Sequence, residues 1–106
     1  MSCNAGLNQY LTVPVPAANG DGPLFDVSGL VAEKTLYIAG DYLGQYVILG
    51  THDDVHLVPI AQFSNGSGPQ TIRRDIIATL KSIVVRRNAS GAPVTINLAA
   101  QATCSC

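Results

Sequence analysis

The sequence predicts an all-β fold, an antiparallel β-sandwich of about seven short strands in one domain with an extended N-terminal arm. Short runs rich in Val, Ile, Leu and Tyr recur along the chain, and glycine, proline, asparagine or aspartate separates them. Turn signals at intervals of roughly eight to twelve residues are typical of sandwiches. No helix is favoured strongly, because apolar residues at helical spacing are soon interrupted by glycine or by β-branched runs.

The 106 residues suit a single domain. We expect residues 1–23 to form the extended arm and residues 101–106 to form a cysteine-containing tail. Within the arm, residues 10–15 are expected to be an edge strand, because Pro14 and Pro16 cannot donate hydrogen bonds to a neighbouring strand.

The middle of the chain predicts a three-stranded antiparallel meander. Its strands are residues 35–40, 45–50 and 55–60, which are rich in β-branched and aromatic residues. The segments between them, residues 41–44 and 51–54, contain the aspartate and glycine that are typical of turns.

The remaining segments are expected to complete the two sheets. Residues 24–31 are expected to be a strand or an extended arm, and residues 64–70 a polar loop. Residues 79–87 and 93–99 predict a hairpin, because apolar and polar residues alternate in the second segment and a Gly-Pro loop joins the two. A short helix over 73–79 is the alternative at the start of this region.

Charge is sparse and unevenly distributed. Charged residues make up 12% of the chain and apolar residues 47%, whereas a typical domain has about 25% charged residues. This composition suits a chain that hides more than one face on a partner, and equally a compact β domain. Residues 1–54 carry six acidic residues and one lysine, a net −5, and residues 55–106 carry five basic residues and one aspartate, a net +4. The two halves either form complementary faces or interleave and cancel.

Nucleic acid is not an expected partner, because the net charge is −1 and no basic strand is studded with aromatic residues. The N-terminus has neither the charged nor the apolar region of a signal peptide. No apolar run approaches the roughly 18 residues of a membrane span. We therefore expect no membrane association, and a setting in the cytoplasm or in a particle assembled there.

Both histidines lie in one short segment, His52-Asp53-Asp54-Val55-His56. On a helix the two rings would share one face, as in zinc proteases, but on a strand they would lie about 13 Å apart. We expect His52 to lie in a turn and His56 on the outer face of the next strand, so this segment does not predict a metal site.

No catalytic constellation emerges from the sequence. Both histidines belong to one segment, no Gly-x-Ser-x-Gly sequence occurs, and the adjacent Asp53 and Asp54 would point apart on a strand. Residues 19–22 lack the spaced acidic ligands and closing glutamate of a calcium loop. We therefore expect a protein that is not an enzyme, with no catalytic residue, cofactor or metal.

Three cysteines lie at the two ends of the chain: Cys3, Cys104 and Cys106. An odd number cannot pair completely within one chain. Three states stay open: reduced thiols, a disulfide between the ends or between subunits, and a soft-metal chelate. Two thiolates at the C-terminus are too few for a structural zinc site without other ligands.

Residues 35–100 resemble small structural proteins of tailed bacteriophages. The pattern is a strand, a glycine-containing turn, a second strand, an acidic turn and a strand ending near Pro59. A closing pair follows, with an arginine-bearing strand, Ser90-Gly91-Ala92-Pro93 and a strand with alternating threonine.

This resemblance implies a capsid cement or decoration protein. Such a chain would bind the major capsid protein on the outside of the phage head, as a dimer or trimer, after assembly in the host cytoplasm. The best candidates for contacts with an acidic capsid surface are arginines, although solvated strand edges would explain them equally well. They are Arg73, Arg74, Arg86 and Arg87.

Two other functions stay open. The first is a phage tail or baseplate component with a carbohydrate-binding face, for which Tyr37, Tyr42 and Tyr46 would form the platform. The alternative for these tyrosines is ordinary cross-strand packing. The second function is an unrelated cytoplasmic β-domain adaptor.

The odd cysteine count makes a direct prediction. Because three thiols cannot all pair within one chain, a thiol-reactive label added after denaturation without reductant will modify every metal-free monomer at least once. Chains with no reactive thiol will migrate as covalent oligomers on non-reducing gels. A monomer of unmodified mass that resists labelling would contradict this.

Overall fold

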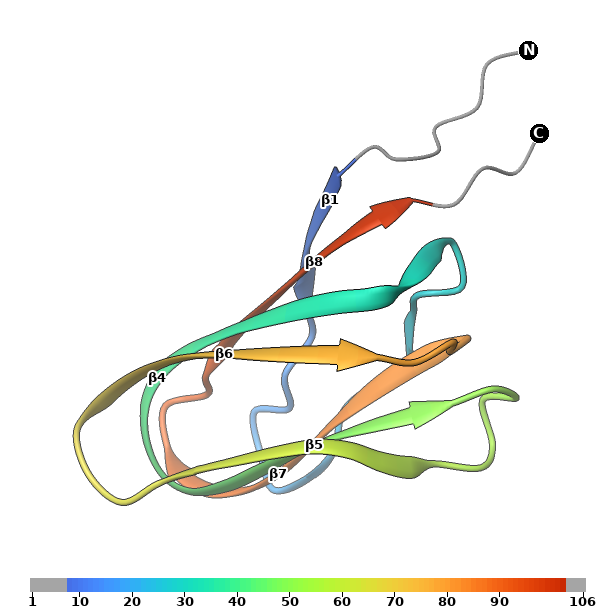
Figure 1. Ribbon diagram of the computed structural model, residues 1–106. Coiled ribbons are helices and arrows are strands. Elements are labelled where there is room, and N and C mark those ends of the chain that lie inside the picture. The colour runs from blue at the N-terminus through green and yellow to red at the C-terminus, as the bar shows by residue number, and fades with distance from the viewer. Residues whose placement is uncertain (1–7, 103–106) are drawn as a thin grey trace, which may run out of the picture.

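The computed structural model describes residues 8–102 (Figure 1). Within this range it has eight β-strands and no helix, and hence none that could span a membrane. The all-β antiparallel prediction is confirmed. The strands are β1 (Asn8–Val13), β2 (Gly20–Asp21), β3 (Phe25–Asp26), β4 (Leu30–Thr51), β5 (Val58–Asn65), β6 (Pro69–Ile77), β7 (Ser82–Gly91) and β8 (Thr95–Ala102).

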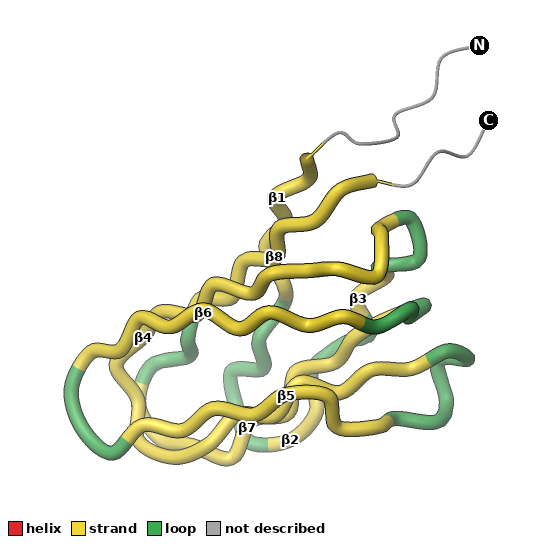
Figure 2. Tube along the Cα trace, viewed as in Figure 1, coloured by secondary structure: helices red, strands yellow, loops and turns green. Residues whose placement is uncertain are grey.

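The long strand β4 belongs to two sheets. Its first half, from Glu33 to Asp41, pairs with β6, and over much of the same span it pairs with β8 on the other side; β1 extends this sheet beyond β8. Its second half, from Tyr42 to Thr51, pairs with β7, and with β5 on the other side, while β2 and β3 pair with β7. We call the first sheet A and the second sheet B; Figure 2 shows β4 curving from one into the other.

The change of partner occurs at a bend in the middle of β4. Asp41 is the last residue paired with β6, opposite Pro69, and Tyr42 is the first paired with β7, opposite Gly91. The connections β5–β6 and β7–β8 both turn at the bend end of the molecule (Figure 1). Each of these strand pairs therefore passes from sheet B to sheet A beside the bend.

Two glycines permit this bend. A Cβ on Gly40 would lie 2.8 Å from a Val94 methyl carbon, and one on Gly44 would lie 2.6 Å from the Asn88 carbonyl oxygen. Gly44 also has a φ of +128°, which side-chain-bearing residues rarely adopt. The glycines allow close approach on the inner side of the bend.

One face of β4 points inward along both sheets. Its buried even-numbered residues include Leu36 and Ile38 in sheet A and Tyr46 and Ile48 in sheet B. Strands β7 and β8 supply the neighbouring core residues Ile83, Val85, Ile96 and Leu98, all of them buried. These side chains belong to one hydrophobic core that both sheets share. Burying each large apolar side chain stabilises the fold by roughly 1.5–3 kcal/mol.

An aromatic cluster fills the core beside the bend. The Tyr46 and Phe63 rings stack with centroids 5.4 Å apart, and the Tyr42 ring meets both of them edge-on. The Tyr42 hydroxyl donates to Gln70 Oε1 over 2.9 Å. This bond ties β4 to the start of β6.

The predicted meander over 35–60 is wrong in its first turn. Residues 41–44 continue β4, so 35–40 and 45–50 are one strand and do not pair with each other. The second turn is correct in place, because the chain reverses after Thr51, and β5 begins at Val58. A glycine often ends a strand, but here Gly40 and Gly44 let one strand bend.

The predicted hairpin of 79–87 with 93–99 does not form. β7 pairs with β4, β2 and β3, whereas β8 pairs with β1 and β4 in the other sheet. Residues 69–77 form β6, so the alternative helix over 73–79 is also wrong. A short loop such as the one after Gly91 can connect strands of two different sheets, and it can equally connect two strands that pair with each other.

The edge strand expected near the N-terminus is present. β1 lies at the edge of sheet A and ends at Val13, directly before Pro14, which confirms the edge strand predicted over 10–15. In the segment 24–31, Phe25–Asp26 forms the short β3 before β4 begins at Leu30.

The bend predicts that alanine at position 44 will be strongly destabilising. Gly44→Ala introduces both a strained φ and a clash with backbone atoms, so we expect a loss of roughly 2–5 kcal/mol in unfolding free energy. Gly66→Ala is the matched control, since its Cβ would meet nothing within 4 Å. Urea denaturation measures both. Similar stabilities for the two variants would contradict the packing described for the bend.

Candidate interaction surfaces

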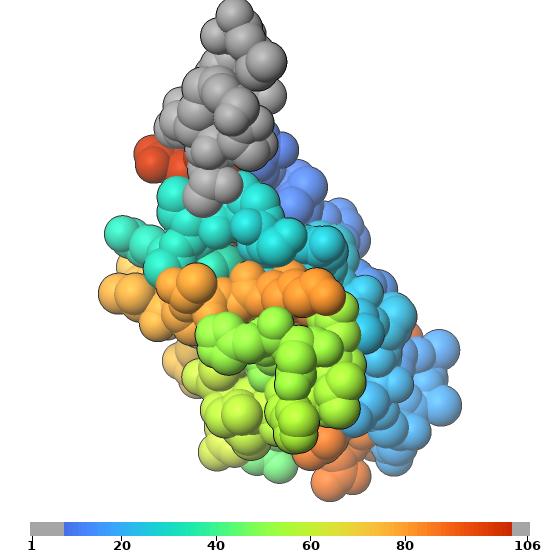
Figure 3. All heavy atoms as spheres, turned by 90° about the vertical axis from the view of Figure 1, so that its right-hand side faces the viewer, coloured from blue at the N-terminus to red at the C-terminus, as the bar shows by residue number. Residues whose placement is uncertain are grey.

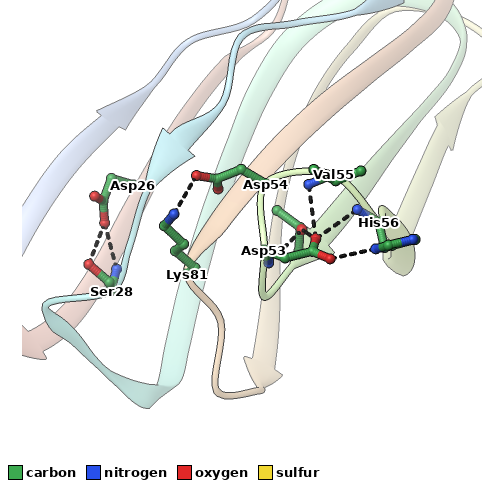
Figure 4. A network of polar contacts seen from close by, with 8 residues as sticks. Asp26, Ser28, Asp53, Asp54, Val55, His56 and Lys81 are labelled. Carbon is green, nitrogen blue, oxygen red and sulfur yellow. Dashed lines mark hydrogen bonds and ion pairs between the residues drawn. The ribbon is translucent and has the colours of Figure 1, made fainter.

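The histidine-containing segment forms the turn between β4 and β5 (Figure 4). One oxygen of Asp53 accepts bonds from the backbone amides of Val55 and His56, over 2.9 and 2.8 Å. The Thr51 hydroxyl donates to the same oxygen over 3.0 Å. The other Asp53 oxygen lies 2.5 Å from His56 Nδ1. The Asp53 carboxylate therefore holds the turn together. The expectation that His56 lies on the next strand is wrong, because His56 belongs to the turn and β5 begins only at Val58.

These contacts shift both titrating groups. The hydrogen bond from the His56 ring, followed by backbone amides, lowers the pKa of Asp53. The same hydrogen bond, followed by the charge of Asp53, raises the pKa of His56. The His56 side chain is 84% exposed, so the pair is a surface ion pair.

A lysine links this turn to a neighbouring loop. Lys81 Nζ lies 2.7 Å from Asp54 Oδ2, and the backbone of Lys81 bonds to both Val27 and Thr51. Figure 3 looks onto this end of the molecule, where the β4–β5 turn and the segment before β7 lie side by side. In residues 8–102, no group of three or more His, Cys, Asp or Glu residues lies close enough together to hold a metal ion.

Acidic and basic halves of the sequence meet in space. Arg86 on β7 binds Asp21 on β2, with Nε 2.6 Å from one carboxylate oxygen. Asp54 and Lys81 form a second pair that joins the two halves. The charges therefore interleave at these contacts, as the second interpretation of the asymmetry expected.

The four predicted contact arginines lie in different surroundings. Arg73 is exposed and binds Asp75 of its own strand, while Arg86 is engaged with Asp21. Arg74 is exposed on the edge strand β6, and its guanidinium forms no hydrogen bond or ion pair with another residue of 8–102. They do not form one patch, because β6 and β7 lie in different sheets.

The structure corrects the expectation that Arg87 is available for contact with a partner. It is 6% exposed, and its guanidinium donates to the carbonyls of Ala17 and Gly91, each over 2.6 Å. It fastens the N-terminal segment to β7 and is not available to a partner. Lys34 is likewise internal: Nζ donates to the Ala32 and Ala78 carbonyls, and burial lowers its pKa.

The predicted tyrosine platform is also corrected. Tyr42 and Tyr46 are buried in the aromatic cluster, and Tyr37 is 42% exposed on the outer face of sheet A. Sequence reasoning missed Tyr10 on β1, which is 65% exposed and whose ring centroid lies 6.2 Å from that of Tyr37. The alternation of side chains along β1 predicts that Tyr10 and Leu11 point to opposite faces of the sheet. The sequence does not show which strand pairs with β1, so it could not predict that Tyr10 lies beside Tyr37.

A groove lies next to Tyr10. Its volume is about 420 Å³, and strands β1, β4 and β8 line it. Ala99 forms its floor, since Ala99 pairs with Tyr10 on one side and Thr35 on the other. Figure 1 shows these three strands side by side. The cysteines Cys3, Cys104 and Cys106 lie outside the described residues, so their pairing stays a prediction.

No protein-family model matches the chain, and no curated protein matches it. Among solved structures, it is similar to the SPBc2 prophage-derived protein YomS, with a TM-score of 0.63 and 13% identity over 88% of this chain and 91% of that chain. The two proteins share a fold. At this identity the likeness concerns the fold alone.

Two further solved structures overlap less closely. One is a protein of Bacillus endospore appendages, described as disulfide-linked pili, with a TM-score of 0.48 and 9% identity over 97% and 98% of the two chains. The other is a family 6 carbohydrate-binding module, with a TM-score of 0.43 and 17% identity over 99% and 88%. TM-scores below 0.5 are too low to support a conclusion.

The Asp53–His56 pair predicts a local pH response. In NMR titrations, His56 will titrate above the ordinary histidine value of about 6.5. Asp53→Asn will lower that pKa, because it removes the carboxylate. Asp54→Asn is the matched control, since Asp54 faces Lys81, and it will leave His56 nearly unchanged.

The raised pKa of His56 and the lowered pKa of Asp53 set how the stability that this ion pair contributes depends on pH. The His56 contribution is complete below about pH 6.5 and is lost as pH rises through its raised value, and the Asp53 contribution is complete above about pH 3.9 and is lost on acidification. Asp53→Asn should therefore destabilise most between these limits. An unchanged His56 titration in Asp53→Asn would contradict the pairing.

Proposed function

We propose that this chain is a structural protein of a tailed-bacteriophage particle and that it acts as a cement protein on the outside of the head. Its partner would be the major capsid protein, and the chain would bind as a dimer or trimer. The observation that carries the proposal is the fold shared with a prophage-derived protein over 88% of this chain and 91% of the other. Both chains thus consist almost entirely of this one sandwich.

The physical requirements of such a role are modest. A cement protein needs surfaces that fit neighbouring subunits, and it needs no reactive group. Many identical copies bind a fixed lattice, so linked sites gain effective concentration and each contact can be weak. Closed symmetric clusters present the same patch two or three times.

Three exposed apolar side chains lie toward one end of this molecule. Val55 in the β4–β5 turn is 73% exposed, Val58 at the start of β5 is 59% exposed and Ile77 at the end of β6 is 80% exposed. The end of β4, the start of β5 and the end of β6 lie toward the same end in Figure 1. We take these exposed apolar side chains as the candidates for contact with a protein partner.

Immunogold labelling of phage particles tests this function. An antibody raised against the purified chain should decorate the heads of particles from the encoding strain, and particles from a strain with the gene deleted provide the matched control. Head labelling is the expected result. Labelling confined to tails would overturn the cement role, and unlabelled particles from a strain that expresses the chain would overturn the particle role altogether.

A further inference from the structure

The outer face of sheet A carries an unusual pair of exposed aromatic side chains. Tyr42, Tyr46 and Phe63 are buried, whereas Tyr10 and Tyr37 are 65% and 42% exposed. Their rings are tilted by 50°, with centroids 6.2 Å apart, and they belong to strands separated by β8. Together they form an aromatic surface that the core does not use.

The groove described above continues this surface. Because Ala99 has a small side chain between Tyr10 and Thr35 in the register, the sheet is hollowed there. Its volume of about 420 Å³ falls within the roughly 300–1,000 Å³ of small-molecule sites. A groove of this size admits one or two sugar units and is too small for a helix.

Hydrogen-bonding groups line the same groove. They are the side chains of Asn8, Glu33 and Gln101, none of which forms a side-chain hydrogen bond with another residue in the described range 8–102. A carboxylate accepts and an amide both donates and accepts, so this set complements hydroxyl groups. Thr35 is held by Asp75 over 3.0 Å and borders the groove with a fixed side chain.

Charge narrows the ligand further. Glu33 contributes a negative charge, and the nearby Arg73 is already paired with Asp75 at 3.0 Å. The groove therefore repels anions such as phosphate or sialic acid. One carboxylate and two amides also supply fewer oxygen ligands than the roughly six to eight that Ca²⁺ takes.

We propose that this groove, together with Tyr10 in its lining and the neighbouring Tyr37, binds a neutral glycan, independently of the particle role. A sugar ring has apolar C–H faces, which pack on aromatic rings, and a rim of hydroxyls, which bond to amides and carboxylates. Tyr10 and Tyr37 supply the stacking surface, and Glu33, Asn8 and Gln101 supply the polar contacts. The amphipathic character of tyrosine suits a surface that is wet when the site is empty.

Binding of the purified chain to immobilised neutral oligosaccharides built from glucose, galactose and N-acetylglucosamine tests the site, with sialylated counterparts as anionic probes. We expect at least one neutral glycan to bind, with NMR shifts confined to residues 8–10, 33–37 and 97–101. Tyr10→Ala and Tyr37→Ala should each weaken binding about fivefold to tenfold, and Glu33→Gln should also weaken it. Because the side chains are exposed, the melting temperature should change little.

Leu43→Ala is the matched control, because Leu43 is also exposed, at 52%, but pairs with β7 in sheet B and is absent from the groove lining. It should bind as the unmodified chain does. Failure of every neutral glycan to bind, preference for the sialylated probes, or equal loss in Leu43→Ala would overturn the proposal. Concentration-dependent shifts at the same residues without sugar would also overturn it, since they would identify this face as a contact between copies. None of these results affects the immunogold experiment, in which an antibody against the chain is expected to label phage heads.

Discussion

The fold depends on one constraint, the bend of β4 between Gly40 and Gly44. Two packed sheets bury the apolar side chains of their inner faces against each other, and here a single strand of 22 residues contributes to both sheets. The side-chain alternation continues through the bend, so Leu36 and Ile48 face the same core from different sheets. Because Gly40 and Gly44 lack a Cβ, Val94 and Ala89 can approach β4 closely. The β5–β6 and β7–β8 connections pass from one sheet to the other beside this bend.

The sequence predicts the fold class well because alternation and turn residues are local signals. It predicts the strand at 10–15 and the reversal after Thr51 for the same reason. It fails at Gly40 and Gly44 because a glycine that ends a strand and one that lets a strand bend look alike. A missed clue was available: the even positions stay apolar or glycine from Leu36 to Gly50, with no change of phase where a turn was expected. Which sheet β7 and β8 join depends on distant partners, and nothing local encodes that.

Candidate site residues were harder to predict because their exposure depends on those partners. Tyr42 and Tyr46 fall on the inner side of β4, whereas Tyr37 falls on the outer side. Tyr10 becomes its neighbour only because β8 lies between β1 and β4. Arg87 shows the same dependence. It follows the exposed Arg86 in sequence, but it points inward and binds the carbonyl of Ala17. Charges that suggested an outer surface thus partly hold the N-terminal segment in place.

The continuity of β4 underlies both the sandwich and the positions of its surfaces, and cross-strand proton contacts in the NMR spectrum test it most directly. One unbroken strand predicts contacts of Leu36 with Leu98 and of Ile48 with Val85, the pairs that lie opposite each other in the two sheets. Contacts between residues 35–40 and 45–50 would instead show a hairpin at Gly40–Gly44, and they would contradict the shared strand.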